Sequence, residues 1–349
     1  MKKLGFLILI GYIILPAYSQ SFSDTFLGEK GIRAMFYNCE NLFDTIHDEG
    51  KQDIDFTANG NYSWTKSRYW QKQQKIAKVI TAVGGWEAPT LVGLAEIENA
   101  HVLVNLVKNT SLATHHYNFV HYESADARGI DVGLLYRPEK FWLVSSRAIP
   151  ICFPFDTASK TRDILYVKGV VLDKDTLHVF INHFPSRLGG QSLSQPKRNF
   201  VASVLKDLTD SVLERNPCAK ILIMGDFNDN PNDESIAISL GAKSVEEFDS
   251  AKLIDLMNSK ENPLKTHFYR GSTGIEWSAL DQIIVSSSLY GTCEGIRTDR
   301  ANVFQADFLM EEDEYANKIP KRTFIGMKYN DGFSDHLPVY VDLFFNEKP

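Results

Sequence analysis

The sequence predicts an α/β fold in which a pair of mixed β-sheets packs together and is flanked by helices, within one domain. Three observations support it: nine strand-like runs, two amphipathic helical stretches, and several strands that follow one another in the middle of the chain. The 349 residues are 44% hydrophobic and 23% charged, which provides enough apolar material for the core of a large globular domain.

The expected strands are short, rich in β-branched residues and, in places, alternate apolar with polar side chains. Leu177-His178-Val179-Phe180-Ile181 shows this alternation, whereas Ile221-Leu222-Ile223 is an unbroken apolar run typical of a buried strand. In chain order, the expected strands are 32–37, 91–95, 117–121, 130–136, 165–172, 177–183, 221–225, 281–285 and 339–344.

The expected helices place apolar residues on one stripe at helical spacing. Segments 66–83 and 200–213 both follow this pattern. The segment from about 302 to 331 follows neither helical nor strand periodicity, and it is long for a structureless loop. We therefore expect it to be a functional insert or a partly ordered lid.

Residues 1–20 have the pattern of a secretory signal peptide, because Lys2 and Lys3 precede a short apolar run and Ala17-Tyr18-Ser19 is small-x-small. A transmembrane anchor is the alternative, but the apolar run is short for a bilayer span and a polar segment follows at once. We therefore expect export to the periplasm or the extracellular space, a mature domain of residues 21–349, and no stable membrane anchor after cleavage.

The net charge and the spacing of the cysteines limit the functions that the protein can have. The net charge of −7 becomes −9 once Lys2 and Lys3 are removed, so bulk positive charge does not hold nucleic acid. A local patch or bound cations can still supply a positive field. Four cysteines in an exported protein permit disulfides, and their wide spacing has no metal-site pattern. Cys39 and Cys152 are expected to be free buried thiols.

Polar side chains recur at the ends of the expected strands. Each one alone has an ordinary explanation; Asp226 and Asn228, for example, suit an Asx turn. Residues two apart on an extended chain also share one face, so these two would point together beyond the strand end. Polar residues occur at six strand boundaries, which is improbable by chance. This indicates a site made of Asn38, Glu96, His183, Asp226, Asn228, Asp281, Asp335 and His336.

The residue types at these boundaries suit one chemistry. Carboxylate and amide oxygens are ligands for Mg²⁺, Mn²⁺ or Ca²⁺ and not for zinc. Histidines supply groups that titrate near neutral pH. The sequence has no nucleophile elbow around a serine or cysteine and no glycine-rich phosphate loop. The pattern therefore favours hydrolysis of a phosphate ester by water at a divalent cation, with Mg²⁺ expected first.

At these positions the chain resembles the endonuclease/exonuclease/phosphatase superfamily, which has the DNase-I-like fold. The resemblance covers residues 31–345 and implies a four-layered α/β sandwich with the site at one rim. The motifs that carry it are Tyr37-Asn38, Leu94-Ala95-Glu96, Asn182-His183, Gly225-Asp226-Phe227-Asn228, Leu280-Asp281 and Ser334-Asp335-His336-Leu337-Pro338-Val339.

The resemblance implies metal ligands and phosphate-facing groups. Glu96 would be the principal metal ligand, with Asn38 beside it and Asp335 close to the metal. Asp226 would orient or activate the attacking water or help to hold the metal. Asn228 would donate a hydrogen bond to the phosphate.

The same resemblance implies roles for two histidines. His336 would contact the scissile phosphate and manage protons, and Asp281 would fix its tautomer. His183 occupies a position where DNase-like members carry a histidine that has a carboxylate partner on a neighbouring strand. Asp131 and Glu123 are the two candidates for that partner.

Three loop arginines, Arg128, Arg187 and Arg270, could grip phosphates that flank the scissile bond. Ordinary solvation on the surface is the alternative for each of them.

Three functions follow from these observations. The first is a secreted, divalent-metal-dependent phosphodiesterase that acts as a nuclease, with nucleic acid as its substrate and no obligate protein partner. The second is a phosphodiesterase for phospholipid or sphingolipid head groups, which would need an exposed apolar hairpin; segment 151–155 is a weak candidate for it and is expected to be packed. The third is a non-catalytic binding module, which is disfavoured because none of the catalytic side chains is missing.

Overall fold

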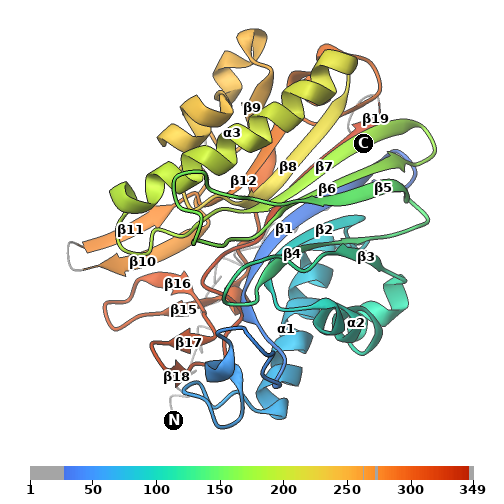
Figure 1. Cartoon of the computed structure of the whole chain (residues 1–349). Coiled ribbons are helices and arrows are strands. Elements are labelled where there is room, and N and C mark those ends of the chain that lie inside the picture. The colour runs from blue at the N-terminus through green and yellow to red at the C-terminus, as the bar shows by residue number, and fades with distance from the viewer. Residues whose placement is uncertain (1–26, 262, 272–273, 346–349) are drawn as a thin grey trace, which may run out of the picture.

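The computed structural model describes residues 27–261, 263–271 and 274–345, and in it two mixed β-sheets pack face to face while helices cover both outer faces (Figure 1). The predicted fold class is confirmed. All nine expected strands are present. The predicted signal peptide, residues 1–20, lies outside the described residues.

The first sheet is built around β1, a buried strand of 12 residues that pairs with β19 in antiparallel and with β2 in parallel orientation. Seven strands form this sheet, in the order β13 (Ile296–Arg297), β19 (Val339–Phe345), β1 (Gly31–Leu42), β2 (Leu91–Ile97), β4 (Asp131–Tyr136) and β3 (Asn118–His121), with β14 (Ala301–Val303) also paired to β19.

The second sheet is built around the parallel pair of β7 and β8, and β12 pairs with β8 in antiparallel orientation. Its six strands lie in the order β5 (Phe141–Ile149), β6 (Ile164–Val171), β7 (Asp175–His183), β8 (Lys220–Asp226), β12 (Asp281–Ser286) and β9 (Leu253–Asp255). The sequence reasoning missed β5, a strand with several exposed residues that has only one buried position, Phe141.

Apolar residues from the inner faces of both sheets form the central core, and each outer face has a second core under its helices. The helices α1 (Lys66–Gly84) and α2 (Ala100–Lys108) cover the first sheet, and α3 (Gln191–Arg215) covers the second (Figure 1). Thr65 caps α1 by accepting a hydrogen bond from the Arg68 amide. The apolar stripe of each helix is therefore buried against a sheet, and this burial holds the helices on the two outer faces.

Helix α3 begins nine residues earlier than the sequence predicts, and it contains Pro196 in its second turn. Proline is unfavourable in the interior of a helix. The sequence therefore predicts the helix only from the apolar stripe that follows Pro196. Two side-chain contacts hold the first turns instead: a local one, in which Ser194 Oγ donates to the Gly190 carbonyl, and a tertiary one, the buried ion pair of Arg198 with Asp229 at 2.7 Å.

Three hairpins stack at one end of the sandwich (Figure 1). They are β10 (His267–Gly271) with β11 (Gly274–Ser278), β15 (Met310–Glu312) with β16 (Lys318–Pro320), and β17 (Phe324–Ile325) with β18 (Lys328–Tyr329). The last two lie within the segment expected to be an insert or lid, so this segment is ordered as two short hairpins.

A disulfide joins Cys218 to Cys293 and so links the start of β8 to the chain that follows β12. Cys39 is a free buried thiol as predicted. Cys152 is free but exposed, so its predicted burial is wrong; its neighbours Ile151 and Phe153 are buried, and the short loop leaves the cysteine between them facing out. No helix in the described part of the chain is long and apolar enough to cross a membrane.

Candidate active site

Three neighbouring strands of the second sheet bring three predicted residues to one rung. β7 ends at His183 and β8 ends at Asp226, and the parallel register places these two residues side by side. β12 begins at Asp281, which lies opposite Asp226 in the antiparallel register. Residues on one rung point to the same side of a sheet, so strand pairing alone gathers these groups at the rim.

The first sheet contributes Asn38 from β1 and Glu96 from β2. These strands pair in parallel, with Asn38 beside Ala95, and the register then shifts before the strands end. Glu96 and Asn41 both have a φ of 59°, and the Asn41 amide donates to Glu96 Oε2 at 2.7 Å. The irregularity therefore holds the Glu96 carboxylate through the backbone, as bulges beside active sites often do.

Asp226 lies at the centre of the site. Its Oδ2 accepts a hydrogen bond from Asn38 Nδ2 at 3.0 Å and lies 3.7 Å from His183 Nε2 and 3.8 Å from His336 Nε2. Its Oδ1 accepts from the Asn228 amide at 2.9 Å. The side chain is buried, and burial raises its pKa to about 7.

His336 is held by a carboxylate on its far side. Asp281 Oδ2 lies 2.7 Å from His336 Nδ1, which leaves Nε2 facing Asp226. Burial opposes the charge on the ring, but the carboxylates of Asp281 and Asp226 raise the pKa of His336 well above its usual value. Burial also opposes the charge on Asp335, but its neighbours His336 and Arg322 lower the pKa of this carboxyl to about 2.

His183 has a different environment, and neither expected partner lies beside it. Its Nε2 is 4.0 Å from Glu96 Oε1, and burial lowers its pKa well below the usual value. Asp131 and Glu123 instead flank His121, at 3.6 Å and 3.9 Å. The expected pairing is wrong because His121 and Asp131 belong to paired strands of the first sheet, whereas His183 ends a strand of the second.

Asn228 is positioned by the backbone of the strand end. It has a φ of 52°, a left-handed conformation that asparagine tolerates better than most residues. Its Nδ2 donates to the Phe184 carbonyl at 3.1 Å. A carboxamide nitrogen carries two hydrogens, so one remains for a further acceptor.

Sequence reasoning missed two residues at this rim, His267 and Arg322. The ring of His267 lies against that of His336, with centroids 4.6 Å apart, at the start of β10. Arg322 Nη2 bonds Asp335 Oδ2 at 2.9 Å, and its Nε bonds Glu40 Oε1 at 3.3 Å. Neither residue follows an apolar run, so no strand-end signal marked them.

The three loop arginines differ in their surroundings. Arg187 and Arg270 both form ion pairs with carboxylates of nearby loops. Arg128 is 43% exposed and lies 3.8 Å from Glu96 Oε2, so it is the one of the three that borders the predicted metal ligand.

The donor set fits a hard divalent cation. Glu96, Asp226 and Asp335 bring three carboxylates to one rim, where Asp226 is buried and the other two are 13% and 18% exposed. Within the described residues two groups of ligand atoms at this rim lie within 4.8 Å of one another, and Glu96 belongs to neither group. One group is Asp226 with Asp281 and His336. Buried carboxylates are costly without a positive partner, and oxygen donors suit Mg²⁺, Mn²⁺ or Ca²⁺.

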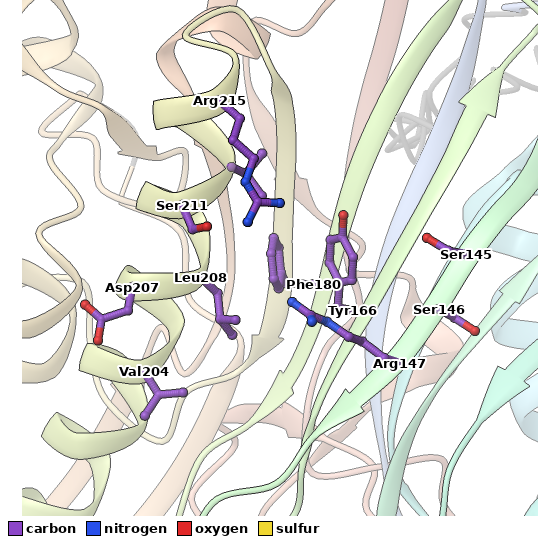
Figure 2. Close-up of a pocket in the computed structure, with 11 residues that line it drawn as sticks. Ser145, Ser146, Arg147, Tyr166, Phe180, Val204, Asp207, Leu208, Ser211 and Arg215 are labelled. Atoms are coloured by element: carbon purple, nitrogen blue, oxygen red, sulfur yellow. The ribbon is translucent and has the colours of Figure 1, made fainter.

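A cavity of about 490 Å³ lies elsewhere, between α3 and strands β5 to β7 (Figure 2). Arg147 and Arg215 extend toward its aromatic side chains, Tyr166 and Phe180. Its lining contains one carboxylate, Asp207, no histidine and none of the eight predicted residues. This cavity is therefore not the chemical centre of the molecule.

Residues 33–344 match the model of a family described as the Endonuclease/Exonuclease/phosphatase family. Among solved structures, D. rerio TDP2 with a single-strand DNA product is 16% identical, with a TM-score of 0.56 over 90% of this chain and 98% of that chain. A Bacteroides thetaiotaomicron mannosyl-6-phosphatase is 17% identical, with a TM-score of 0.55 over 90% and 100%. The human Nocturnin catalytic domain is 16% identical, with a TM-score of 0.51 over 90% and 95%. No curated protein sequence matches.

Proposed function

The chain belongs to the endonuclease/exonuclease/phosphatase family and is a hydrolase that acts on phosphoric ester bonds, and we propose that its water nucleophile is activated beside Asp226 in the presence of a divalent cation. One observation carries the proposal. The eight residues expected from the sequence form one connected network of contacts no longer than 4.0 Å, which Asn228 joins through its backbone N–H, and Asp226 is its centre.

In the proposed reaction, Asp226 orients the attacking water and Asn228 donates its remaining amide hydrogen to a phosphate oxygen. The neighbouring carboxylates raise the pKa of His336 well above its usual value, which favours a proton on Nε2 that can be donated to the phosphate or to the leaving oxygen. Asp281 keeps the proton on Nδ1 of His336 and thereby fixes the ring.

Glu96 is the proposed principal metal ligand, with Asn38 and Asp335 beside it. Asn38 already donates to Asp226 and accepts from the Glu40 amide, so its role is to hold the Asp226 carboxylate as well as to border the metal. The cation, when bound, would polarise the phosphate and lower the pKa of water. His183, which is neutral, would donate from Nε2 to a phosphate oxygen.

Two substrate classes compete. Nucleic acid is the class expected from the sequence, and a fold relative is described with a single-strand DNA product. A phosphate ester of a small polar molecule is the second candidate, because carboxylates dominate the wall beside Asp335. The lipid alternative has less support, since Ile151 and Phe153 of segment 151–155 are buried and only Phe155, which is 55% exposed, presents a large apolar side chain there.

We also propose that residues 21–349 act as one exported domain after removal of residues 1–20. The Cys218–Cys293 disulfide supports export, because disulfides persist mainly in oxidising compartments.

The proposal is tested by a metal panel on the purified protein. After treatment with EDTA, hydrolysis of bis(p-nitrophenyl) phosphate, plasmid DNA, RNA and sphingomyelin is measured with Mg²⁺, Mn²⁺ or Ca²⁺ added back. We expect no hydrolysis in EDTA and recovery of at least one activity with at least one cation. Full activity in EDTA would contradict the proposal.

A further inference from the structure

A cavity of about 600 Å³ adjoins the catalytic network, and we call it the hairpin pocket. This volume lies within the range of small-molecule sites. The three stacked hairpins build its walls (Figure 1). It is lined by Phe268, Tyr269, Arg270, Glu311, Glu312, Asp313, Glu314, Ile319, Pro320, Arg322, Ile325, Asn330 and Asp335.

The pocket is continuous with the site. Asp335 belongs to both, and Arg322 binds Asp335 from the pocket side. β10 begins at His267, whose ring lies against His336, and its next residues form one wall. A phosphate held at His336 would therefore have the rest of its molecule beside this pocket.

The charge of the lining disfavours a polyanion. Five carboxylates face two guanidinium groups, and both guanidinium groups are already paired. Arg270 pairs with Asp313 and Glu314, and Arg322 pairs with Asp335. No unpaired cation remains among the described lining residues to attract further phosphates, on which nucleic-acid binding depends.

Polar side chains of the pocket are hydrogen-bonded to one another in donor–acceptor pairs. Asn330 Nδ2 donates to Glu311 Oε1 at 2.8 Å, and Arg270 donates to Asp313. A hydroxyl group both donates and accepts, so it can bond to both members of such a pair. Hydroxyl-rich ligands therefore match these pairs, and a cationic head group, which the acidic lining would also attract, is the competing occupant that phosphocholine tests.

The same pocket offers apolar surface. Tyr269 is 60% exposed and Ile325 is 54% exposed, and both belong to the lining. An aromatic ring beside fixed polar groups can pack against the C–H face of a ring-shaped ligand while its hydroxyl groups are bound at the edge.

Resting on the proposed phosphoesterase function, we propose that the hairpin pocket binds an uncharged, hydroxyl-rich group, such as a sugar, that is esterified to the phosphate cleaved at His336. The segment 302–331 is then a substrate-selecting insert, and the preferred substrate is a sugar phosphate and not a polynucleotide.

The test compares substrates and pocket variants of the full chain with the activating cation. The substrates are a hexose monophosphate, phosphocholine, a single-stranded oligodeoxynucleotide and p-nitrophenyl phosphate. The variants are Glu312→Gln and Tyr269→Ala, with Glu214→Gln on the exposed end of α3 as the matched control. We expect kcat/KM for the hexose phosphate to exceed that for phosphocholine and the oligonucleotide by about tenfold or more.

Each pocket variant should lose about tenfold in kcat/KM on the hexose phosphate and keep its rate on p-nitrophenyl phosphate, while the control changes neither. A preference for the oligonucleotide or for phosphocholine would overturn this inference. Unchanged hydrolysis of the hexose phosphate by the pocket variants would also overturn it. Neither result would contradict the phosphoesterase function. Absence of hydrolysis of every substrate here would overturn this inference, and the phosphoesterase function would fall with it only if the metal panel also showed no hydrolysis of bis(p-nitrophenyl) phosphate, plasmid DNA, RNA or sphingomyelin.

Discussion

The two sides of Asp226 carry histidines at nearly the same distance but in opposite states. His183 Nε2 lies 3.7 Å and His336 Nε2 lies 3.8 Å from Asp226 Oδ2, and both rings are buried. His336 has Asp281 at 2.7 Å on its Nδ1, whereas Nδ1 of His183 has no hydrogen-bond partner in the described structure. The pKa of His336 is raised and that of His183 is lowered.

The difference shows what a second carboxylate does to a buried imidazole. Burial alone disfavours the charged ring, and for His183 this effect dominates, with the positive charges of Arg162 and Arg128 adding to it. For His336, the negative charges on both sides outweigh burial. One side of Asp226 therefore holds a proton donor and the other a neutral ring, which separates the two roles.

Asp226→Asn should reduce activity most, because it removes the carboxylate that lies between the two histidines. The amide keeps the shape but cannot accept a proton or hold a cation as a carboxylate does, so hydrolysis should fall by about 10³-fold or more. Initial rates on bis(p-nitrophenyl) phosphate and thermal unfolding are the measurements. A folded variant with activity within tenfold of the wild type would contradict the role of Asp226.

Asp281→Asn should break the His336 side alone. Activity should fall by about tenfold to a hundredfold, because the ring keeps a neighbour but loses the carboxylate that charges it. A raised folded pKa means that His336 stabilises the fold fully below its unfolded value of about 6.5 and that this contribution is lost as the pH rises through the folded pKa.

Removal of the Asp281 charge should therefore cost about 2 kcal/mol of unfolding free energy near pH 6 and less at alkaline pH. Urea unfolding at several pH values and the NMR titration of the His336 ring in metal-free protein measure this. An unchanged ring pKa in the variant would show that Asp281 does not hold the proton.

His183→Gln should have the smallest effect on activity, about tenfold, because a neutral donor replaces a neutral donor. Its stability in acid reports whether the His183 ring is neutral in the folded protein. The unfolded chain takes up a proton at His183 near pH 6.5 that the folded chain does not, so stability falls as the pH falls below this value. The variant should lose about 2 kcal/mol less than the wild type between pH 7 and pH 5, as measured by urea unfolding. Equal losses would mean that His183 is protonated in the fold.

Much of the fold follows from local pattern. The unbroken apolar run of β8 and the alternation in β7 are enough to predict strands, because both patterns lie within a few consecutive residues and both strands contain β-branched residues. The pattern did not reveal β5, whose side chains are largely exposed, nor the first turns of α3, which depend on Arg198 and Asp229. Contacts between distant segments carry no local periodicity, so sequence reasoning could not find these parts.

Some features of the site could likewise be predicted from the sequence, and others could not. The chemical groups at the strand ends, from Asn38 to His336, could be read from the sequence alone, because a polar residue that follows an apolar run is visible without the fold. The partner of His336, Asp281, was expected from the family resemblance and is present. The folded chain was needed to show that Nδ1 of His183 has no partner in the described structure and that His267 and Arg322 lie at the rim. Strand register and packing set these distances, and the charge on each imidazole depends on distances of a few ångströms.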